Sequence, residues 1–180
     1  MRKYQINCPL ITESVPEHDR YKDELLLKIK QSGGEKIIGG VDCVTSIITS
    51  GDYFHENDRS YEPLFFTMAK DTIQKLIKEF FDVSSTEFKC EPTIPWYQQY
   101  HHGDTHSWHD HAGGSTLSVI YYLELPEGTP GTEFIDPYTG RVHRPRVKEG
   151  DVIVFPSFVR HRSPENKSDQ RKTIISLNYV

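Results

Sequence analysis

The sequence predicts a single, mainly β domain whose helices gather in the first half of the chain. Three observations support this prediction: the length of 180 residues, a change in hydrophobic periodicity near residue 85, and many short apolar runs after it. A chain of this length can bury a core without disulfides or metals. Short strands separated by Gly and Pro turns are typical of a sandwich or barrel.

Two amphipathic helices are expected before residue 85. In residues 17–31, apolar residues recur among charged ones, and the segment is followed by Gly33. In residues 61–81, apolar residues recur at spacings of three and four. Both patterns, and a glycine just beyond the last periodic residue, are helix signals. β-Branched residues at 44–49 favour a short extended stretch. We therefore interpret residues 1–85 as a helical support region.

The second half of the chain is interpreted as a series of short strands. Turn-forming Gly and Pro residues separate most of them. Residues 86–180 are therefore expected to form the β core of one undivided domain. The expected strands are residues 88–94, 96–100, 115–125, 132–135, 141–147, 152–155 and 172–180.

Charge and composition exclude some classes of function. The formal net charge is -5, whereas a general nucleic-acid-binding surface needs a basic excess. Basic residues alternate along residues 141–146. They could form a rim that selects an anionic or peptide substrate. The favoured interpretation is a strand face exposed to solvent. The N-terminal residues contain no apolar run typical of a signal peptide, and no segment is apolar enough to span a membrane. A cytoplasmic protein is therefore expected.

A cluster of histidines is the strongest functional signal. Five of the nine histidines fall between positions 101 and 111, and imidazole is a common ligand of iron, zinc, copper and nickel. Residues i and i+2 of a strand share a face, so His109 and His111 are expected to face one metal while Asp110 points away. His161, which follows a strand and a Phe-Pro-Ser turn, is the candidate third ligand. Solvent-facing His-x-His pairs are also ordinary, so the pair alone does not establish a metal site.

The order of motifs from Trp96 onward resembles that of the 2-oxoglutarate/Fe(II)-dependent oxygenases. The motifs are the His-x-His pair, a Tyr-Tyr-Leu strand, the Phe-Pro-Ser turn with its later histidine, and a terminal Arg…Ser-x-Asn strand. More narrowly, they resemble a small group of these enzymes that is often virus-encoded or bacterial; a viral origin would place the protein in the host cytoplasm. The resemblance implies a double-stranded β-helix, or jelly roll, with the N-terminal helices packed on one sheet.

The resemblance also implies residue roles. Fe(II) would be held by three catalytic ligands, His109, His111 and His161. Arg171 would bind the distal carboxylate of 2-oxoglutarate, because a guanidinium matches a carboxylate in a bidentate way. The alternative for Arg171 is a solvated surface residue. Tyr100 and Tyr122 are further candidates for hydrogen bonds to the co-substrate, and each is alternatively a packed strand tyrosine.

One position departs from the wider family, which carries His-x-Asp where this chain has His109-Asp110-His111. A neutral third ligand would leave one more unit of positive charge at the metal. Asp110 would replace His111 as the ligand if a β-bulge turned it inward. The literal His-x-Asp at positions 102–104 is better explained as a turn. The role of His106 is left open: it either contacts the ligand residues from outside the metal site or lies on the surface.

The implied function is hydroxylation of an unidentified small-molecule or peptide substrate, with Fe(II), 2-oxoglutarate and O2. Peptidyl or prolyl hydroxylation is a candidate at the level of the family. One alternative is a three-histidine jelly-roll dioxygenase that does not use 2-oxoglutarate, and another is a non-catalytic metal-binding jelly-roll module. A zinc hydrolase is less supported, because no carboxylate is obviously placed as its general base.

Overall fold

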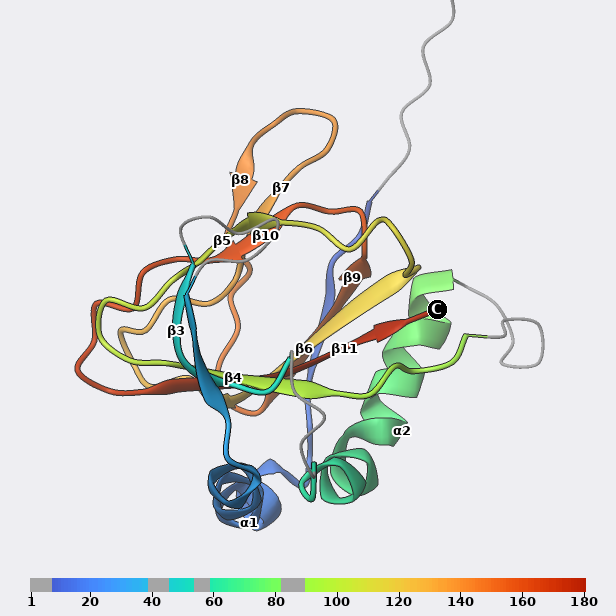
Figure 1. Cartoon of the computed structure of the whole chain (residues 1–180). Coiled ribbons are helices and arrows are strands. Elements are labelled where there is room, and N and C mark those ends of the chain that lie inside the picture. Colours follow the sequence, from blue (N-terminus) through green and yellow to red (C-terminus); the bar gives the residue numbers. More distant parts are fainter. Residues whose placement is uncertain (1–7, 39–45, 54–58, 82–89) are drawn as a thin grey trace, which may run out of the picture.

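The molecule is built on two antiparallel β-sheets that face each other, with two helices on the outer side of the larger sheet (Figure 1). The computed structural model describes residues 8–38, 46–53, 59–81 and 90–180. The larger sheet has seven strands and the smaller has four. This is the predicted jelly roll, with the candidate site residues between the sheets.

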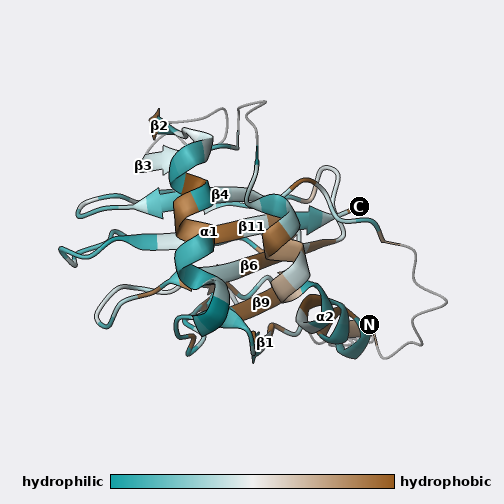
Figure 2. Cartoon of the chain, turned by 90° about the horizontal axis from the view of Figure 1, so that it is seen from below, coloured by the Kyte–Doolittle hydropathy of each residue, from teal (hydrophilic) through white to brown (hydrophobic). Residues whose placement is uncertain are grey.

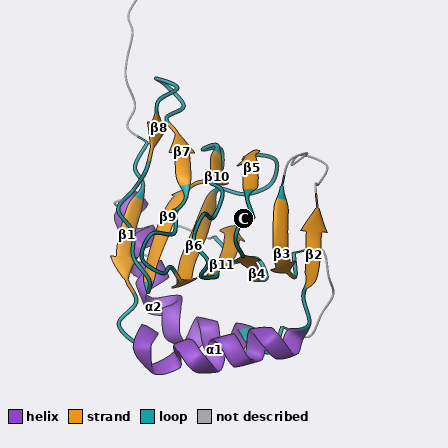
Figure 3. Ribbon diagram, turned by 90° about the vertical axis from the view of Figure 1, so that its left-hand side faces the viewer, coloured by secondary structure: helices purple, strands orange, loops and turns teal. Residues whose placement is uncertain are grey.

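The strand order places the middle of the chain and its end at the centre of the larger sheet. Figure 3 shows this sheet edge-on above the helices, with the smaller sheet beyond it. The larger sheet consists, in order, of β1 (Ile11–Ser14), β9 (Asp151–Pro156), β6 (Leu117–Glu124), β11 (Lys172–Tyr179), β4 (Trp96–Tyr100), β3 (Ile47–Gly51) and β2 (Glu35–Ile38). The smaller sheet consists, in order, of β5 (His106–His109), β10 (His161–Ser163), β7 (Glu133–Ile135) and β8 (Val142–His143).

Both predicted helices are confirmed and cover one face of the larger sheet (Figure 2). The first, α1 (His18–Ser32), ends at Gly33, which adopts the left-handed conformation that favours glycine. The second, α2 (Glu62–Phe81), buries a row of apolar residues that includes Phe65 and Ile73. Among the described residues, neither helix combines the length and the apolar character needed to cross a bilayer.

The first half of the chain is more than the helical support region that the sequence predicted. Strands β1, β2 and β3 come from it, and β1 pairs with β9 in the larger sheet. The stretch predicted at 44–49 overlaps β3, although residues 44 and 45 lie outside the described residues. β1 has a single large apolar residue, Ile11, and the two isoleucines of β2 are adjacent, so neither segment shows the apolar alternation that identifies a strand.

Most strands expected in the second half are confirmed. The strand at 96–100 matches β4, and those at 115–125, 132–135, 152–155 and 172–180 match β6, β7, β9 and β11 within about two residues. The strand expected at 141–147 shrinks to the two residues of β8. In the described part of 88–94, only an isolated bridge between Pro92 and Tyr179 forms. Strands β5 and β10 were not predicted as such, although both carry histidines of the candidate site.

The larger sheet separates two apolar regions by alternation along its strands. Along β11, Ile175 and Leu177 pack with the helices, whereas Ile174 belongs to the cluster between the sheets. The same alternation along β6 places Tyr121 toward the helices and Tyr122 toward the smaller sheet. The second face also carries the polar residues of the candidate site.

Candidate functional site

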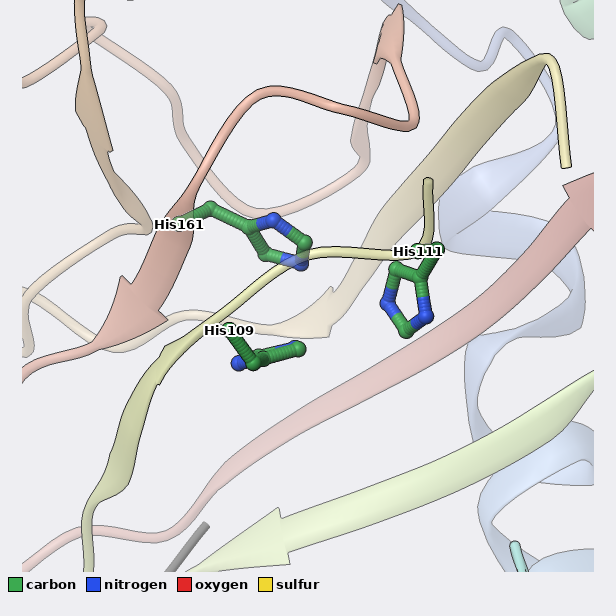
Figure 4. A group of neighbouring side chains, drawn as sticks. All are labelled: His109, His111 and His161. Carbon is green, nitrogen blue, oxygen red and sulfur yellow. The ribbon is translucent and has the colours of Figure 1, made fainter. Parts of the chain in front are cut away.

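Three histidine side chains converge between the two sheets (Figure 4). One possible ligand atom from each of His109, His111 and His161 lies within 4.8 Å of the others. The ring centroids of His109 and His161 are 4.2 Å apart, and that of His111 is 5.2 Å from His109 and 5.3 Å from His161. The sequence prediction that these three residues lie together is therefore consistent with the structure.

The pairing of two strands brings the first and third histidines together. His109 at the end of β5 is the direct cross-strand partner of His161 at the start of β10, and such partners lie close enough for their side chains to meet. The expectation that His109 and His111 share one strand is wrong, because β5 ends at His109. His111 is instead held by its backbone N–H, which donates to the Ser157 carbonyl at 2.8 Å.

Backbone carbonyls fix the tautomer of two histidines. Nδ1 of His109 lies 2.8 Å from the Ser107 carbonyl, and Nδ1 of His161 lies 3.0 Å from the Val159 carbonyl. A carbonyl only accepts, so each Nδ1 carries the proton and each Nε2 keeps its lone pair. A hydrogen bond from the other ring nitrogen is the usual support for a metal-binding histidine. These two rings are therefore prepared to bind a metal through Nε2.

Burial keeps the three imidazoles neutral. Desolvation is the largest cause of the lowered pKa of His109, His111 and His161. For His111 and His161, the neighbouring ring of His109 lowers the pKa further. The pKa of His111 falls to about 4. A neutral imidazole offers the lone pair that a metal needs. The donor set therefore fits a divalent metal that accepts nitrogen ligands, iron included.

A cavity of about 220 Å³ adjoins the histidines. Residues of β4 and β11 that alternate along their strands line one side of it, among them Gln98, Ile174 and Ser176. Trp96 and Tyr53 supply aromatic wall near His111, with the Trp96 and His111 ring centroids 6.1 Å apart. The cavity therefore combines an apolar wall with polar groups close to the histidines, as ligand pockets commonly do.

The two aspartates considered as ligands lie apart from the histidine cluster. Asp110 is exposed at the edge of the cavity, and its carboxylate accepts from the Ala112 N–H at 3.3 Å. Asp104 is buried and accepts from the backbone N–H groups of Thr49 and His101. His102 points away to Asp169. The interpretation of residues 102–104 as a turn is confirmed, since Gly103 has a φ of 84°.

Arg171 does not lie where the resemblance implied. Its guanidinium donates to both carboxylate oxygens of Glu124, at 2.7 and 2.8 Å, and it is not among the residues that line the cavity. The cause is register, because consecutive residues of a strand face opposite sides. Lys172, Ile174 and Ser176 share one side of β11, so Arg171 lies on the other side.

Lys172, the next residue along the chain, is a buried cation near the cavity that the sequence analysis did not consider. Its side chain is buried, and its ammonium donates to Ser163 Oγ and, at 3.2 Å, to the Pro130 carbonyl. Nζ also lies 4.5 Å from the centroid of the Tyr100 ring. Ser163 and Tyr100 both line the cavity. Desolvation lowers the pKa of Lys172 to about 7. An anionic partner would stabilise the charged form of this amine.

The two predicted tyrosines differ in position. Tyr100 lines the cavity, and its hydroxyl donates to Gln98 Oε1 at 3.1 Å. Tyr122 is fully buried and its hydroxyl donates to Thr132 Oγ1 at 2.9 Å, so only its partner Thr132 reaches the cavity wall. Tyr100 thus lies where the prediction requires, whereas Tyr122 is packed behind the wall.

The basic residues at 141–146 form a solvated arm, as the favoured interpretation predicted. Arg141, His143, Arg144 and Arg146 are all exposed. Arg144 donates to Glu133 at 2.5 Å, and Glu133 also binds Arg162. Part of the positive charge is therefore neutralised within the protein.

No family model and no curated protein matches this sequence. Solved structures do match. A 2OG-Fe(II) oxygenase family oxidoreductase from Burkholderia pseudomallei aligns over 94% of this chain and 84% of its own, with a TM-score of 0.69 and 11% identity. A prolyl-4-hydroxylase from Pseudomonas putida aligns over 96% and 92%, with a TM-score of 0.60 and 13% identity.

A third similar structure is the viral collagen prolyl hydroxylase of Paramecium bursaria Chlorella virus-1, solved as a 2OG complex. It aligns over 94% of each chain, with a TM-score of 0.59 and 18% identity. Identities this low establish a shared architecture. The chain has the double-stranded β-helix fold of the 2OG-Fe(II) oxygenases.

Proposed function

We propose that this protein is an Fe(II)- and 2-oxoglutarate-dependent oxygenase that hydroxylates a substrate bound in the cavity between its sheets. The observation that carries the proposal is the convergence of three neutral histidines beside a cavity and a buried lysine, within this fold. The histidines alone would suit several metals. The buried lysine is what favours an anionic co-substrate.

The proposed metal ligands are His109, His111 and His161. His111 is preferred to Asp110 because its ring lies in the cluster, whereas Asp110 is exposed and accepts from Ala112. Three neutral ligands leave the full charge of a divalent metal unbalanced by the protein. A dianionic co-substrate such as 2-oxoglutarate would balance that charge, which supports this assignment over a neutral ligand.

Lys172, in place of Arg171, is the proposed partner of the distal carboxylate of 2-oxoglutarate. Its ammonium is buried against the cavity residues Ser163 and Tyr100, and its present acceptors are a carbonyl and a hydroxyl without full charge. Arg171 already has a carboxylate partner in Glu124. A carboxylate ligand would stabilise a buried ammonium more than a half-exposed guanidinium that is already paired with a carboxylate.

The remaining residues would orient ligands and exclude water. Bound iron would supply the activation of O2 that protein side chains cannot provide. His109, His111 and His161 would hold the metal, and the cavity beside them would receive the ligands. Trp96, Tyr53 and Ile48 provide apolar wall near them, which would keep water from the reacting centre. The substrate itself is not assigned, and prolyl peptides are the first to test, because two of the similar structures described above are prolyl hydroxylases.

The test is an anaerobic visible spectrum of the untagged protein with Fe(II), before and after addition of 2-oxoglutarate. We expect a new charge-transfer band, and in air the release of succinate from 2-oxoglutarate, with faster release when a substrate is supplied. His102→Ala is the matched control, because His102 is an exposed histidine of the same segment. It should leave both signals unchanged.

The opposite outcomes identify the alternatives. Iron bound without a new band or succinate would contradict the use of 2-oxoglutarate and favour the three-histidine dioxygenase. Zinc retained through purification, with no exchange for Fe(II), would favour the non-catalytic metal-binding module.

A further inference from the structure

Asn178 lies at the opposite end of the cavity face of β11 from Lys172. Ile174 and Ser176 lie between them on the same face of the strand. Six residues of a strand span about 20 Å, whereas the carbon chain of 2-oxoglutarate has four bonds of about 1.5 Å each. A co-substrate held by Lys172 would therefore not reach Asn178, and this end of the cavity is available to another ligand.

Hydrogen bonds connect Asn178 with the histidine cluster. The backbone N–H of His111 donates to the Ser157 carbonyl at 2.8 Å, and Ser157 Oγ lies 3.0 Å from Ser118 Oγ. Ser118 in turn donates to Asn178 Oδ1 at 2.8 Å. The amide of Asn178 therefore lies on the His111 side of the proposed metal site, where a substrate would be bound beside the metal.

The contacts of Asn178 fix its amide oxygen and leave its amide nitrogen open. Oδ1 is bound by Ser118, and the backbone N–H and C=O both pair with Thr93. Among the described residues, Nδ2 has no hydrogen-bond partner. In the same part of the chain, His18 Nε2 is the only polar side-chain atom that lacks a partner and is also closed off from solvent. Since the Asn178 side chain lines the cavity and is only 8% exposed, its Nδ2 opens into the cavity.

Polar residues nearer to Lys172 are instead hydrogen-bonded to each other. Tyr100 donates to Gln98 Oε1 at 3.1 Å, and Gln98 Nε2 lies 3.4 Å from His106 Nδ1. His106 reaches this position through a β-bulge, because three steps along β5, from His106 to His109, match two along β10. A buried polar group without a partner costs free energy, which an apolar residue of similar size would avoid. The open nitrogen of Asn178 therefore indicates a ligand.

The surroundings of Asn178 suit a neutral acceptor. Its cross-strand partner is Ser118, and those of neighbouring Ser176 are Ile120 and Trp96. An ionised group would find no opposite charge among these four residues. Side chains two residues apart on a strand repeat at about 7 Å, which is also the repeat of carbonyl groups along one side of an extended peptide.

We propose that Asn178 binds the substrate, by donating its side-chain N–H groups to a carbonyl oxygen of a peptide or of a smaller amide. The hydroxyl of Ser176 would meet the next polar group of an extended peptide, and the ring of Trp96 would contact its side chains. The proposal rests on the proposed function and names the chemical class that this site recognises.

Binding is measured by nuclear magnetic resonance of the Zn(II)-loaded protein, with and without 2-oxoglutarate. The probes are N-acetylalaninamide and a series of tripeptides that are blocked at both ends and differ in the central residue, at up to about millimolar concentration. We expect a probe to shift the side-chain amide signals of Asn178, which are identified by their absence in Asn178→Leu. Tighter binding of a tripeptide would assign the ligand as an extended peptide, and equal binding would assign it as a single amide.

Two substitutions test the hydrogen bond. Asn178→Leu keeps the volume, whereas Asn178→Asp keeps the oxygen that accepts from Ser118 and loses the N–H donors. We expect each to bind the probe about tenfold less tightly, because an acceptor of the ligand is left unsatisfied. Affinity for 2-oxoglutarate should stay within about twofold of wild type. Gln170→Glu makes the same amide-to-acid change at an exposed position outside the cavity and should match the wild type.

Probe affinity equal to wild type in both variants, or failure of every probe to bind, would overturn the inference and leave the proposed function intact. If one variant does not fold, the other decides. A loss of 2-oxoglutarate affinity in place of probe affinity would also overturn it, because Asn178 would then belong to the co-substrate site. A probe bound through Asn178 by a protein that does not bind 2-oxoglutarate would support Asn178 as an amide-binding residue and contradict the proposed function.

Discussion

The two faces of the larger sheet are built from the same strands but have different compositions. Toward the helices, β11 directs Ile175 and Leu177 into an apolar core. Toward the smaller sheet, the same strand directs Lys172, Ser176 and Asn178, of which the last two line the cavity. The difference shows that one strand contributes one set of residues to the core and the alternate set to the cavity. Substitutions on the two faces should therefore separate folding from function.

The largest effect on the cavity face is expected from His161→Ala. It removes a candidate ligand that is buried and hydrogen-bonded through Nδ1 to Val159. Loss of a residue that supports a ligand costs about 10- to 100-fold in metal affinity, so loss of a ligand should cost more than about 100-fold. Fe(II) or Co(II) titration measures this loss. Metal affinity equal to wild type would remove His161 from the site.

On the helix face, Leu177→Ala should act on folding alone. Leu177 is fully buried in the core against the helices, and truncation of such a residue costs about 2–5 kcal/mol of unfolding free energy. Urea denaturation measures the loss. Metal affinity of the folded fraction should match the wild type, and a large fall in it would break the separation between the faces.

Lys172→Met should weaken 2-oxoglutarate with little effect on metal binding. Removal of a charged partner of a carboxylate corresponds to about 10- to 100-fold in affinity. Methionine fills a similar volume in this buried position. The anaerobic titration used for wild type measures the change. Unaltered 2-oxoglutarate affinity would place the carboxylate elsewhere in the cavity.

The affinity of the wild-type protein for 2-oxoglutarate should fall as pH rises above 7. Burial lowers the pKa of Lys172 to about 7, so above that pH the free protein holds the neutral amine. The carboxylate pairs with the protonated amine, so binding takes up a proton and weakens by up to about tenfold per pH unit. Titrations between pH 7 and 9 should show this dependence, and Lys172→Met should lack it. The same slope in both proteins would assign the titration to another group.

The smallest effect is expected from Arg171→Met. Its pair with Glu124 is half-exposed, and such pairs contribute about 0–1 kcal/mol to stability. Affinity for 2-oxoglutarate should stay within about twofold of wild type, because Arg171 lies on the opposite side of β11 from the cavity. A loss as large as that of Lys172→Met would restore Arg171 as the co-substrate residue.

The sequence was sufficient to predict the helices, the central strands and the three clustered histidines. Those features depend on local periodicity and on motifs that occur in a fixed order. The strands β1 and β2 were not predictable, because neither Ile-Thr-Glu-Ser nor Glu-Lys-Ile-Ile alternates apolar and polar residues. Lys172, the proposed partner of 2-oxoglutarate, lies one position after Arg171, and a motif does not reveal which of two adjacent residues faces the cavity. His106 could not be placed because a bulge depends on the partner strand.

The extra residue in β5 has a consequence for the comparison of distant relatives. In a regular strand, the residue that shares the face of His109 is two positions before it, at Ser107, whereas here His106 lines the cavity three positions before it. An alignment that superimposes His-x-His motifs without a gap would therefore equate His106 with a residue on the wrong face of an unbulged relative. Its counterpart should be sought with a one-residue gap between positions 106 and 109, and the residue type found there would show which side chain each relative places in the same part of its cavity wall.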